Sequence, residues 1–195
     1  MKKHLPNSLT ILRIILIPFF FNFLINGDSV IAILLFFVAC STDFFDGFYA
    51  RKYNATTNFG IFIDPLADKL LTTSAFIGFM FLDIFNLQLT WMMVAIIFTR
   101  DIIITLLRMI MEIQGITMIT SKLGKVKTLL QMSAISYMLL ILYMYTYKFM
   151  IYKSLLNSNS VYYVMVCTVL VTSYTGIHYL YYNKKSIKSI FLKVK

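Results

Sequence analysis

The sequence predicts an all-α, polytopic membrane protein whose helices cross the bilayer six times. Hydrophobic residues make up 59% of its 195 residues and charged residues only 13%, whereas soluble domains average about 25% charged residues. The apolar residues gather into six runs, each near the roughly 20 residues that a helix needs to cross a bilayer. A helix also satisfies its own backbone hydrogen bonds, which hydrocarbon requires of a spanning segment. The composition therefore excludes a soluble globular domain.

The six runs follow one another without an internal repeat or a long linker, so we expect residues 1–195 to form a single domain. The first run ends at a strong turn signal, Asn26-Gly27-Asp28. The predicted spans are 9–25, 29–49, 64–82, 89–110, 126–147 and 161–182.

Lysine and arginine residues predict the orientation of these spans. They concentrate at the N-terminus, after the second and fourth spans, and in the C-terminal tail, whereas the opposite connections carry only Lys148 and Lys153. Because positively charged loops face the cytoplasm, we expect both termini on the cytoplasmic side of the cell membrane. The net charge of +10 then indicates contact with anionic membrane lipids, and no nucleic acid is expected as a partner.

Four aspartates in one short stretch are candidates for chemistry. Carboxylates in a membrane are costly, which makes such residues functional candidates by default. Asp43 and Asp46 are spaced i, i+3, so they share one face of the second helix. Asp64 and Asp68, spaced i, i+4, share one face of the third. We expect the two pairs to form an oxygen-rich site for Mg²⁺ or Mn²⁺, the hard cations that accompany phosphates.

Neighbouring residues suit a bulky ligand that carries phosphate. Gly47 has no side chain, so a ligand can approach a metal held by the adjacent Asp46. Arg51 lies on the same helical face as Gly47 and suits a diphosphate. Gly60 precedes Asp64 by about one helical turn. Close helix packing explains glycines in membranes equally well.

The stretch from Asp43 resembles the signature of the CDP-alcohol phosphatidyltransferase family. It reads DFFDGFYAR from Asp43 to Arg51, then continues to Gly60, Asp64 and Asp68 at the spacing of that family. Three further segments resemble the bacterial phosphatidylglycerophosphate synthases. They are residues 6–13 (PNSLTILR), residues 124–128 (GKVKT), and the pair Arg100-Asp101 with Arg108, where Asp101 replaces their usual glutamate.

The resemblance implies transfer of the phosphatidyl group of CDP-diacylglycerol to an alcohol, with sn-glycerol 3-phosphate as the expected acceptor. It implies two metal ions, Mg²⁺ or Mn²⁺, a homodimer, and Asp68 as the general base. The implied metal ligands are Asp43, Asp46, Asp64 and Asp68. The implied contacts with the CDP-lipid are Gly47, Arg51, Thr57, Gly60, Asn7 and Thr10.

Cations on the same side of the membrane are candidates for binding the acceptor phosphate. They are Arg100, Arg108, Lys122, Lys125 and Lys127. Orientation of the chain and contact with lipid headgroups explain the three lysines equally well. Arg13, at the start of the first span, is explained as well by snorkelling as by function.

Two alternatives stay open from the sequence. The first is the same chemistry with another acceptor, namely phosphatidylglycerol as in a cardiolipin synthase, serine or inositol phosphate. The second is a cation-coupled transporter, because buried aspartates also serve as relays. Transporters often contain repeated halves, whereas the aspartates here cluster at one face and no repeat is visible in the sequence.

Overall fold

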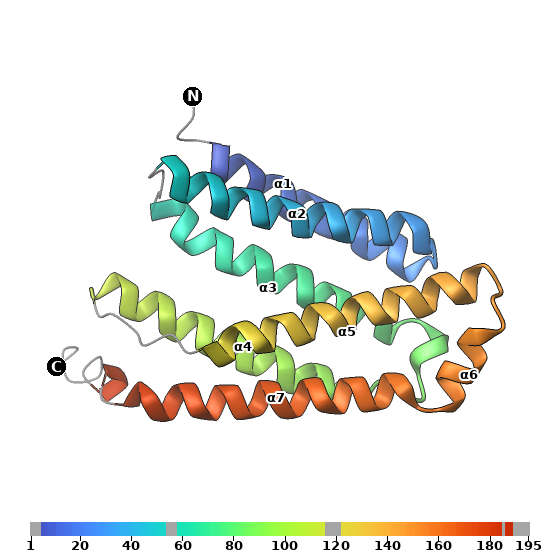
Figure 1. The fold of residues 1–195 in the computed structure, drawn as a ribbon. Helices are drawn as coiled ribbons and strands as arrows, with labels where there is room; N and C mark the ends of the chain where they lie inside the picture. The colour runs from blue at the N-terminus through green and yellow to red at the C-terminus, as the bar shows by residue number, and fades with distance from the viewer. Residues whose placement is uncertain (1–4, 54–57, 116–121, 185, 189–195) are drawn as a thin grey trace.

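The computed structural model describes residues 5–53, 58–115, 122–184 and 186–188 (Figure 1). Side chains are described in the same ranges, apart from residues 5–7, 44–53, 58–62 and 122. The described chain is helical throughout, as the sequence predicts. Its helices are α1 (Leu5–Ile25), α2 (Ser29–Tyr53), α3 (Asn58–Met80), η1 (Asp83–Phe85), α4 (Trp91–Ile113), α5 (Lys122–Thr146), α6 (Ile151–Asn157) and α7 (Ser160–Tyr182).

Each of the six predicted spans coincides with one of the long helices. The boundary differs most at α3, which begins at Asn58, and α2 continues past the predicted end to Tyr53. At α2 the apolar run ends at Arg51 and Lys52, whereas the helix continues as long as its backbone hydrogen bonds do. At α3 the additional residues 59–63 are mainly apolar, so the predicted span began too late. The seven-residue helix α6 was not predicted, because so short an element gives no periodic signal.

Membrane crossing is supported for part of the bundle. In the part of the chain that the structure describes, three helical segments are long and apolar enough to cross a bilayer, namely Ser8–Ile25, Leu123–Thr146 and Ser160–Tyr182. A shorter apolar stretch, Ser29–Asp43, lies in α2. These segments are what a membrane protein requires, while the full set of six crossings stays a prediction.

Apolar side chains on the outer surface agree with a lipid environment. Leu129 of α5 is 68% exposed and Ile177 of α7 is 70% exposed. Large apolar side chains are also exposed along α1 and α2. A water-soluble surface rarely carries so extensive an apolar area.

The turn between α1 and α2 forms where the sequence predicts it. Gly27 adopts a left-handed conformation with φ of +77°, which favours glycine. The Gly27 N–H donates to the Leu24 carbonyl at 3.1 Å, and the Asp28 N–H donates to the Phe23 carbonyl at 3.0 Å. This is the hydrogen-bond pattern of a Schellman motif, which closes α1 and reverses the chain into α2.

Two packed groups of helices make up the bundle (Figure 1). Helix α1 packs against α2 and α3, and α7 packs against α4 and α5, with α3 also contacting α4. Gly78 of α3 lets Leu24 of α1 approach closely, since a Cβ at residue 78 would lie 2.5 Å from Leu24 Cδ2. Small residues at such contacts are typical of helix packing in membranes.

Successive long helices alternate in direction, which places distant parts of the chain at one end of the bundle. The end of α2, the beginning of α3, the ends of α4 and α7, and the beginning of α5 all lie toward the left of Figure 1. The predicted aspartates and most of the predicted phosphate-binding cations lie in these halves of the helices, and Arg100 lies near the middle of α4. Chain direction alone therefore brings the two predicted sets toward the same region.

Candidate active site

A cavity of about 1280 Å³ lies between the helices that meet at this end. Its wall combines α3, α4 and α5 with Asp43 of α2 and Tyr179 of α7. It brings together three of the predicted metal ligands and four of the predicted phosphate-binding cations. These residues are Asp43, Asp64, Asp68, Arg100, Arg108, Lys125 and Lys127.

Each of the three aspartates already contacts a polar or cationic side chain of the protein. Asp64 accepts a hydrogen bond from the hydroxyl of Thr10, which is buried in α1. Asp68 forms an ion pair with its neighbour Lys69, which also lines the cavity. These contacts offset the repulsion that clustered carboxylates otherwise suffer.

Arg13 supplies the partner of the third aspartate. Its Nη1 lies 2.8 Å from Asp43 Oδ1, and its Nε donates to the Thr42 hydroxyl at 3.4 Å. The Arg13 side chain is 0% exposed, whereas that of Asp43 is 54% exposed. A wholly buried guanidinium does not reach the headgroups, so snorkelling does not account for Arg13.

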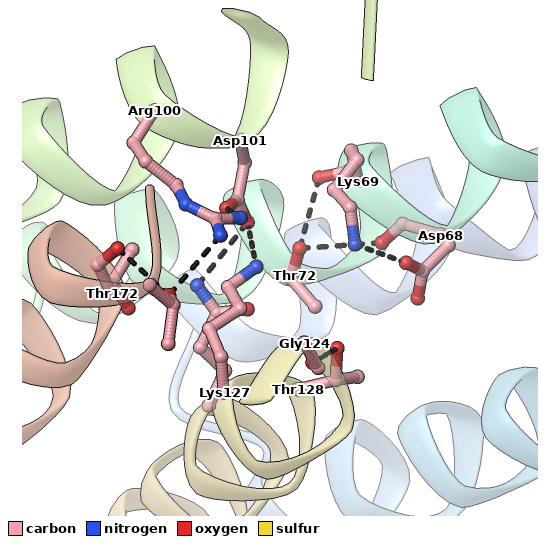
Figure 2. A network of polar contacts seen from close by, with 11 residues as sticks. Asp68, Lys69, Thr72, Arg100, Asp101, Gly124, Lys127, Thr128 and Thr172 are labelled. Atoms are coloured by element: carbon pink, nitrogen blue, oxygen red, sulfur yellow. Dashed lines mark hydrogen bonds and ion pairs between the residues drawn. The ribbon is translucent and has the colours of Figure 1, made fainter. Parts of the chain in front are cut away.

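The cationic side of the cavity is organised by Asp101, which is 3% exposed. Lys127 Nζ donates to Asp101 Oδ2 at 2.5 Å, and Arg100 Nη1 donates to Asp101 Oδ1 at 3.2 Å. Gln131 Nε2 adds a hydrogen bond to Oδ2 at 3.2 Å. Figure 2 shows the side chains of Arg100 and Lys127 directed at Asp101 from α4 and α5. Both carboxylate oxygens are thus used, as a buried charge requires.

Helix α7 completes this network. The Thr175 hydroxyl accepts a hydrogen bond from Arg100 Nη2 at 3.1 Å. The stem of Arg100 passes over Gly176, where an added Cβ would lie 2.9 Å from Arg100 Cγ. Helices α4, α5 and α7 are therefore joined by a polar network, of which Arg100 and Lys127 line the cavity.

Comparison of the sequence with known protein families assigns the chain to one of them. Residues 3–174 match the CDP-alcohol phosphatidyltransferase family. This chain belongs to that family.

Relatives of known name cover most of the chain. The chain is 41% identical to a CDP-diacylglycerol–glycerol-3-phosphate 3-phosphatidyltransferase of Bacillus subtilis over 152 residues, which are 70% of this chain and 77% of the relative. It is 39% identical to the Escherichia coli K12 protein of the same name over 144 residues, 71% of this chain and 78% of that protein. A probable phosphatidylglycerophosphate synthase of Mycobacterium tuberculosis H37Rv is 36% identical over 182 residues, 90% of this chain and 79% of that protein.

The carboxylate side chains in the cavity of this phosphatidyltransferase are of the chemical type that binds a hard divalent cation. Carboxylate oxygens are the ligands that Mg²⁺ and Mn²⁺ prefer, and Asp43, Asp64 and Asp68 line one cavity. Within the described ranges, no three of the His, Cys, Asp and Glu side chains stand close enough together to hold a metal ion. The side chain of Asp46, the fourth predicted ligand, lies outside the described residues. Coordination of two ions by the four aspartates therefore stays a prediction.

Most of the predicted CDP-lipid contacts also lie outside the described side chains. Thr57 lies outside the described residues altogether, and Thr10 is the one contact of this set whose side chain is described. For the remaining contacts only the backbone is described: Asn7 lies in α1, Gly47 and Arg51 lie in α2, and Gly60 lies in α3. The same holds for the predicted acceptor ligand Lys122 in α5.

Sequence reasoning missed several residues that line the cavity or contact its cations. Asp101 was considered only as a replacement for glutamate in a motif, although an acid inside a predicted span is itself a signal. Lys69 carried a similar signal, because it is a basic residue inside a predicted span, next to Asp68. Thr175 and Gly176 carried none, because a threonine and a glycine in an apolar helix are ordinary.

A second, smaller cavity of about 220 Å³ adjoins the carboxylates. Asp43, Asp68, Met132 and Ser136 line both cavities. The rest of its wall comes mainly from apolar side chains of α2 and α3. Asp43 and Asp68 therefore lie between a cavity that contains several cations and a smaller, predominantly apolar one.

Proposed function

We propose that this enzyme transfers the phosphatidyl group of CDP-diacylglycerol to sn-glycerol 3-phosphate, giving phosphatidylglycerophosphate and CMP. The observation that carries the proposal is the cavity that joins the signature carboxylates to a group of cations. The names of the relatives from Bacillus subtilis and Escherichia coli favour this acceptor over others.

Asp68 is the proposed general base. The acceptor hydroxyl must lose a proton as it attacks the phosphorus that carries the diacylglycerol, and a carboxylate within reach can accept it. Asp68 lines the cavity and forms an ion pair with its neighbour Lys69, so its carboxylate lies where an acceptor bound in the cavity can reach it. CMP leaves in the same displacement, so no covalent intermediate with the enzyme is required.

Asp43, Asp46, Asp64 and Asp68 are the residues that would hold Mg²⁺ or Mn²⁺. When bound, two such ions polarise the phosphoryl group and neutralise charge on the departing CMP. Thr10 would orient the Asp64 carboxylate through their hydrogen bond, and Arg13 would do the same for Asp43. Both contacts come from α1, which gives the N-terminal segment a role in shaping the site.

The acceptor phosphate would bind the cations of α4 and α5. Arg100 and Arg108 offer planar guanidinium groups that match a phosphate with two parallel hydrogen bonds, and Lys125 and Lys127 add point charges. Neutral acceptors such as serine make no use of four cations. This difference in charge is the reason for preferring a phosphorylated acceptor.

The lipid donor would lie across the two cavities. Its diphosphate would meet the carboxylate-bound ions, and its diacylglycerol portion would extend toward the apolar wall of the smaller cavity. Contacts of the cytidine and diphosphate with Asn7, Thr10, Gly47, Arg51, Thr57 and Gly60 belong to this proposal. So do six membrane crossings, a cytoplasmic active site, contact with anionic lipids and a homodimer.

An acceptor panel tests the function. Purified protein in liposomes receives labelled CDP-diacylglycerol, Mg²⁺ and one of sn-glycerol 3-phosphate, phosphatidylglycerol, serine or inositol phosphate. We expect CMP release only with glycerol 3-phosphate. Activity with phosphatidylglycerol alone would instead identify a cardiolipin synthase. Cation flux without CMP release from any mixture would support the transporter alternative.

A further inference from the structure

The contact between Arg100 and Gly176 depends on the missing side chain of the glycine. A Cβ at residue 176 would lie 2.9 Å from Arg100 Cγ and 3.1 Å from its Nε. Gly176 is buried in α7, so a side chain there has no open space to enter. Any larger residue at this position therefore displaces the stem of Arg100.

Thr175 fixes the other end of the same arginine. Its hydroxyl donates to the Thr172 carbonyl at 3.0 Å, which directs its lone pairs toward Arg100 Nη2 at 3.1 Å. Asp101 accepts from Nη1 at 3.2 Å. Two helices thus hold the guanidinium through two different nitrogens, and this restricts a side chain that otherwise samples many rotamers.

Charge makes this restraint relevant to an anionic ligand. Arg100 and Lys127 share the single carboxylate of Asp101, so the group keeps an excess of positive charge. Both cations line the large cavity, together with Arg108. A fixed cation that needs no reordering binds a phosphate more tightly than a mobile one.

We propose that Thr175 and Gly176 are positioning residues that hold Arg100 in place for the phosphate of the acceptor. This inference rests on the proposed function and adds a role for α7, which the sequence did not suggest. Both residues follow the segment that matches the family, which ends at residue 174. Their assignment comes from their contacts alone.

Steady-state kinetics on three variants tests the role. Gly176→Ala displaces the stem of Arg100, Thr175→Val removes the hydroxyl that holds its guanidinium, and Thr175→Ser keeps that hydroxyl. We expect Gly176→Ala and Thr175→Val to raise the KM for glycerol 3-phosphate about tenfold, as expected for loss of one charge-assisted contact. The KM for CDP-diacylglycerol should stay within about twofold of the wild-type value, because weaker binding of the acceptor leaves the contacts of the donor unchanged. Thr175→Ser should restore the wild-type KM.

Gly78→Ala is the matched control. It also adds a methyl group at a tight contact between helices, against Leu24 Cδ2 at 2.5 Å, but residue 78 does not line the cavity. We expect a lower thermal midpoint and unchanged KM values for both substrates. If Gly176→Ala does not fold, the Thr175→Val and Thr175→Ser pair decides the matter.

Two results would overturn the inference. One is an unchanged KM for glycerol 3-phosphate in the variants that fold. The other is an equal change in the KM of both substrates, which a purely structural role predicts. A wild-type protein without activity toward glycerol 3-phosphate refutes the proposed function itself, and that failure is seen before any variant is made.

Discussion

Replacing Asp101 by asparagine removes the one carboxylate on which Arg100 and Lys127 converge. Asparagine preserves the size of the side chain, so the change tests charge and not packing. Its amide also places a donor where Asp101 Oδ2 now accepts hydrogen bonds from Lys127 and Gln131. Lys127, which is 2% exposed, is then left as a buried cation without a counter-charge.

The size of the effect follows from the burial of the pair. Removing one partner of a buried ion pair costs about 3–5 kcal/mol, because the other charge stays desolvated and uncompensated. Asp101 and Lys127 are both almost fully buried, so little discount for solvent applies. For a chain of this length, about 3 kcal/mol corresponds to a fall of roughly 6–12 °C in the thermal midpoint.

Thermal unfolding in detergent, followed by intrinsic fluorescence, measures the change. Lys127→Met and the double variant complete a cycle in which the lysine charge is also removed. We expect the double variant to be less destabilised than the sum of the single variants by more than about 1 kcal/mol, as for residues in direct contact. Additive effects, or an Asp101→Asn midpoint within about 2 °C of wild type, would show that this carboxylate does not stabilise the cations.

Three further predictions concern the carboxylate side of the cavity. Asp68→Asn should leave the thermal midpoint within a few degrees of wild type and reduce kcat by a factor on the order of 100 or more, as expected for loss of a general base; wild-type turnover would remove Asp68 from that role. Thr10→Val should raise the Mg²⁺ concentration needed for half-maximal activity several-fold, because Asp64 loses its hydrogen bond, with Thr10→Ser as the control that keeps the hydroxyl. Exhaustive chelation should abolish CMP release and added Mg²⁺ should restore it; activity that survives chelation would exclude the metal site.

The sequence predicted the helices well because lipid imposes a simple rule on them. Apolar runs of sufficient length must be helical, and every predicted span coincides with a long helix. The rule describes side chains and not helix ends, so the polar extension of α2 to Tyr53 was not predicted. The beginning of α3 at Asn58 was missed although residues 59–63 are mainly apolar. A short connecting helix such as α6 obeys no such rule.

The candidate site was predicted where residue spacing carries information. The i, i+4 spacing of Asp64 and Asp68 and the alternating direction of the helices suffice to direct them toward one cavity, which they line. The partner of Asp68 is its neighbour Lys69, whereas the partners of Asp64 and Asp43 come from another helix. Thr10 and Arg13, both in α1, contact the aspartates through the packing of α1 against α2 and α3, and no local spacing encodes that packing.

Buried cations show most clearly what a pattern of residues leaves undetermined. From the sequence alone, Arg13 and Lys127 are equally compatible with headgroup contact and with function, because either side chain is long enough to reach the surface. Snorkelling needs no partner, whereas burial is tolerated only when a carboxylate lies within reach. Arg13 has Asp43 and Lys127 has Asp101, and both cations are buried. A basic residue near the end of a spanning helix is therefore best interpreted together with the acidic residues on the helices packed against it, since they determine whether its charge faces lipid headgroups or stays fixed within the protein.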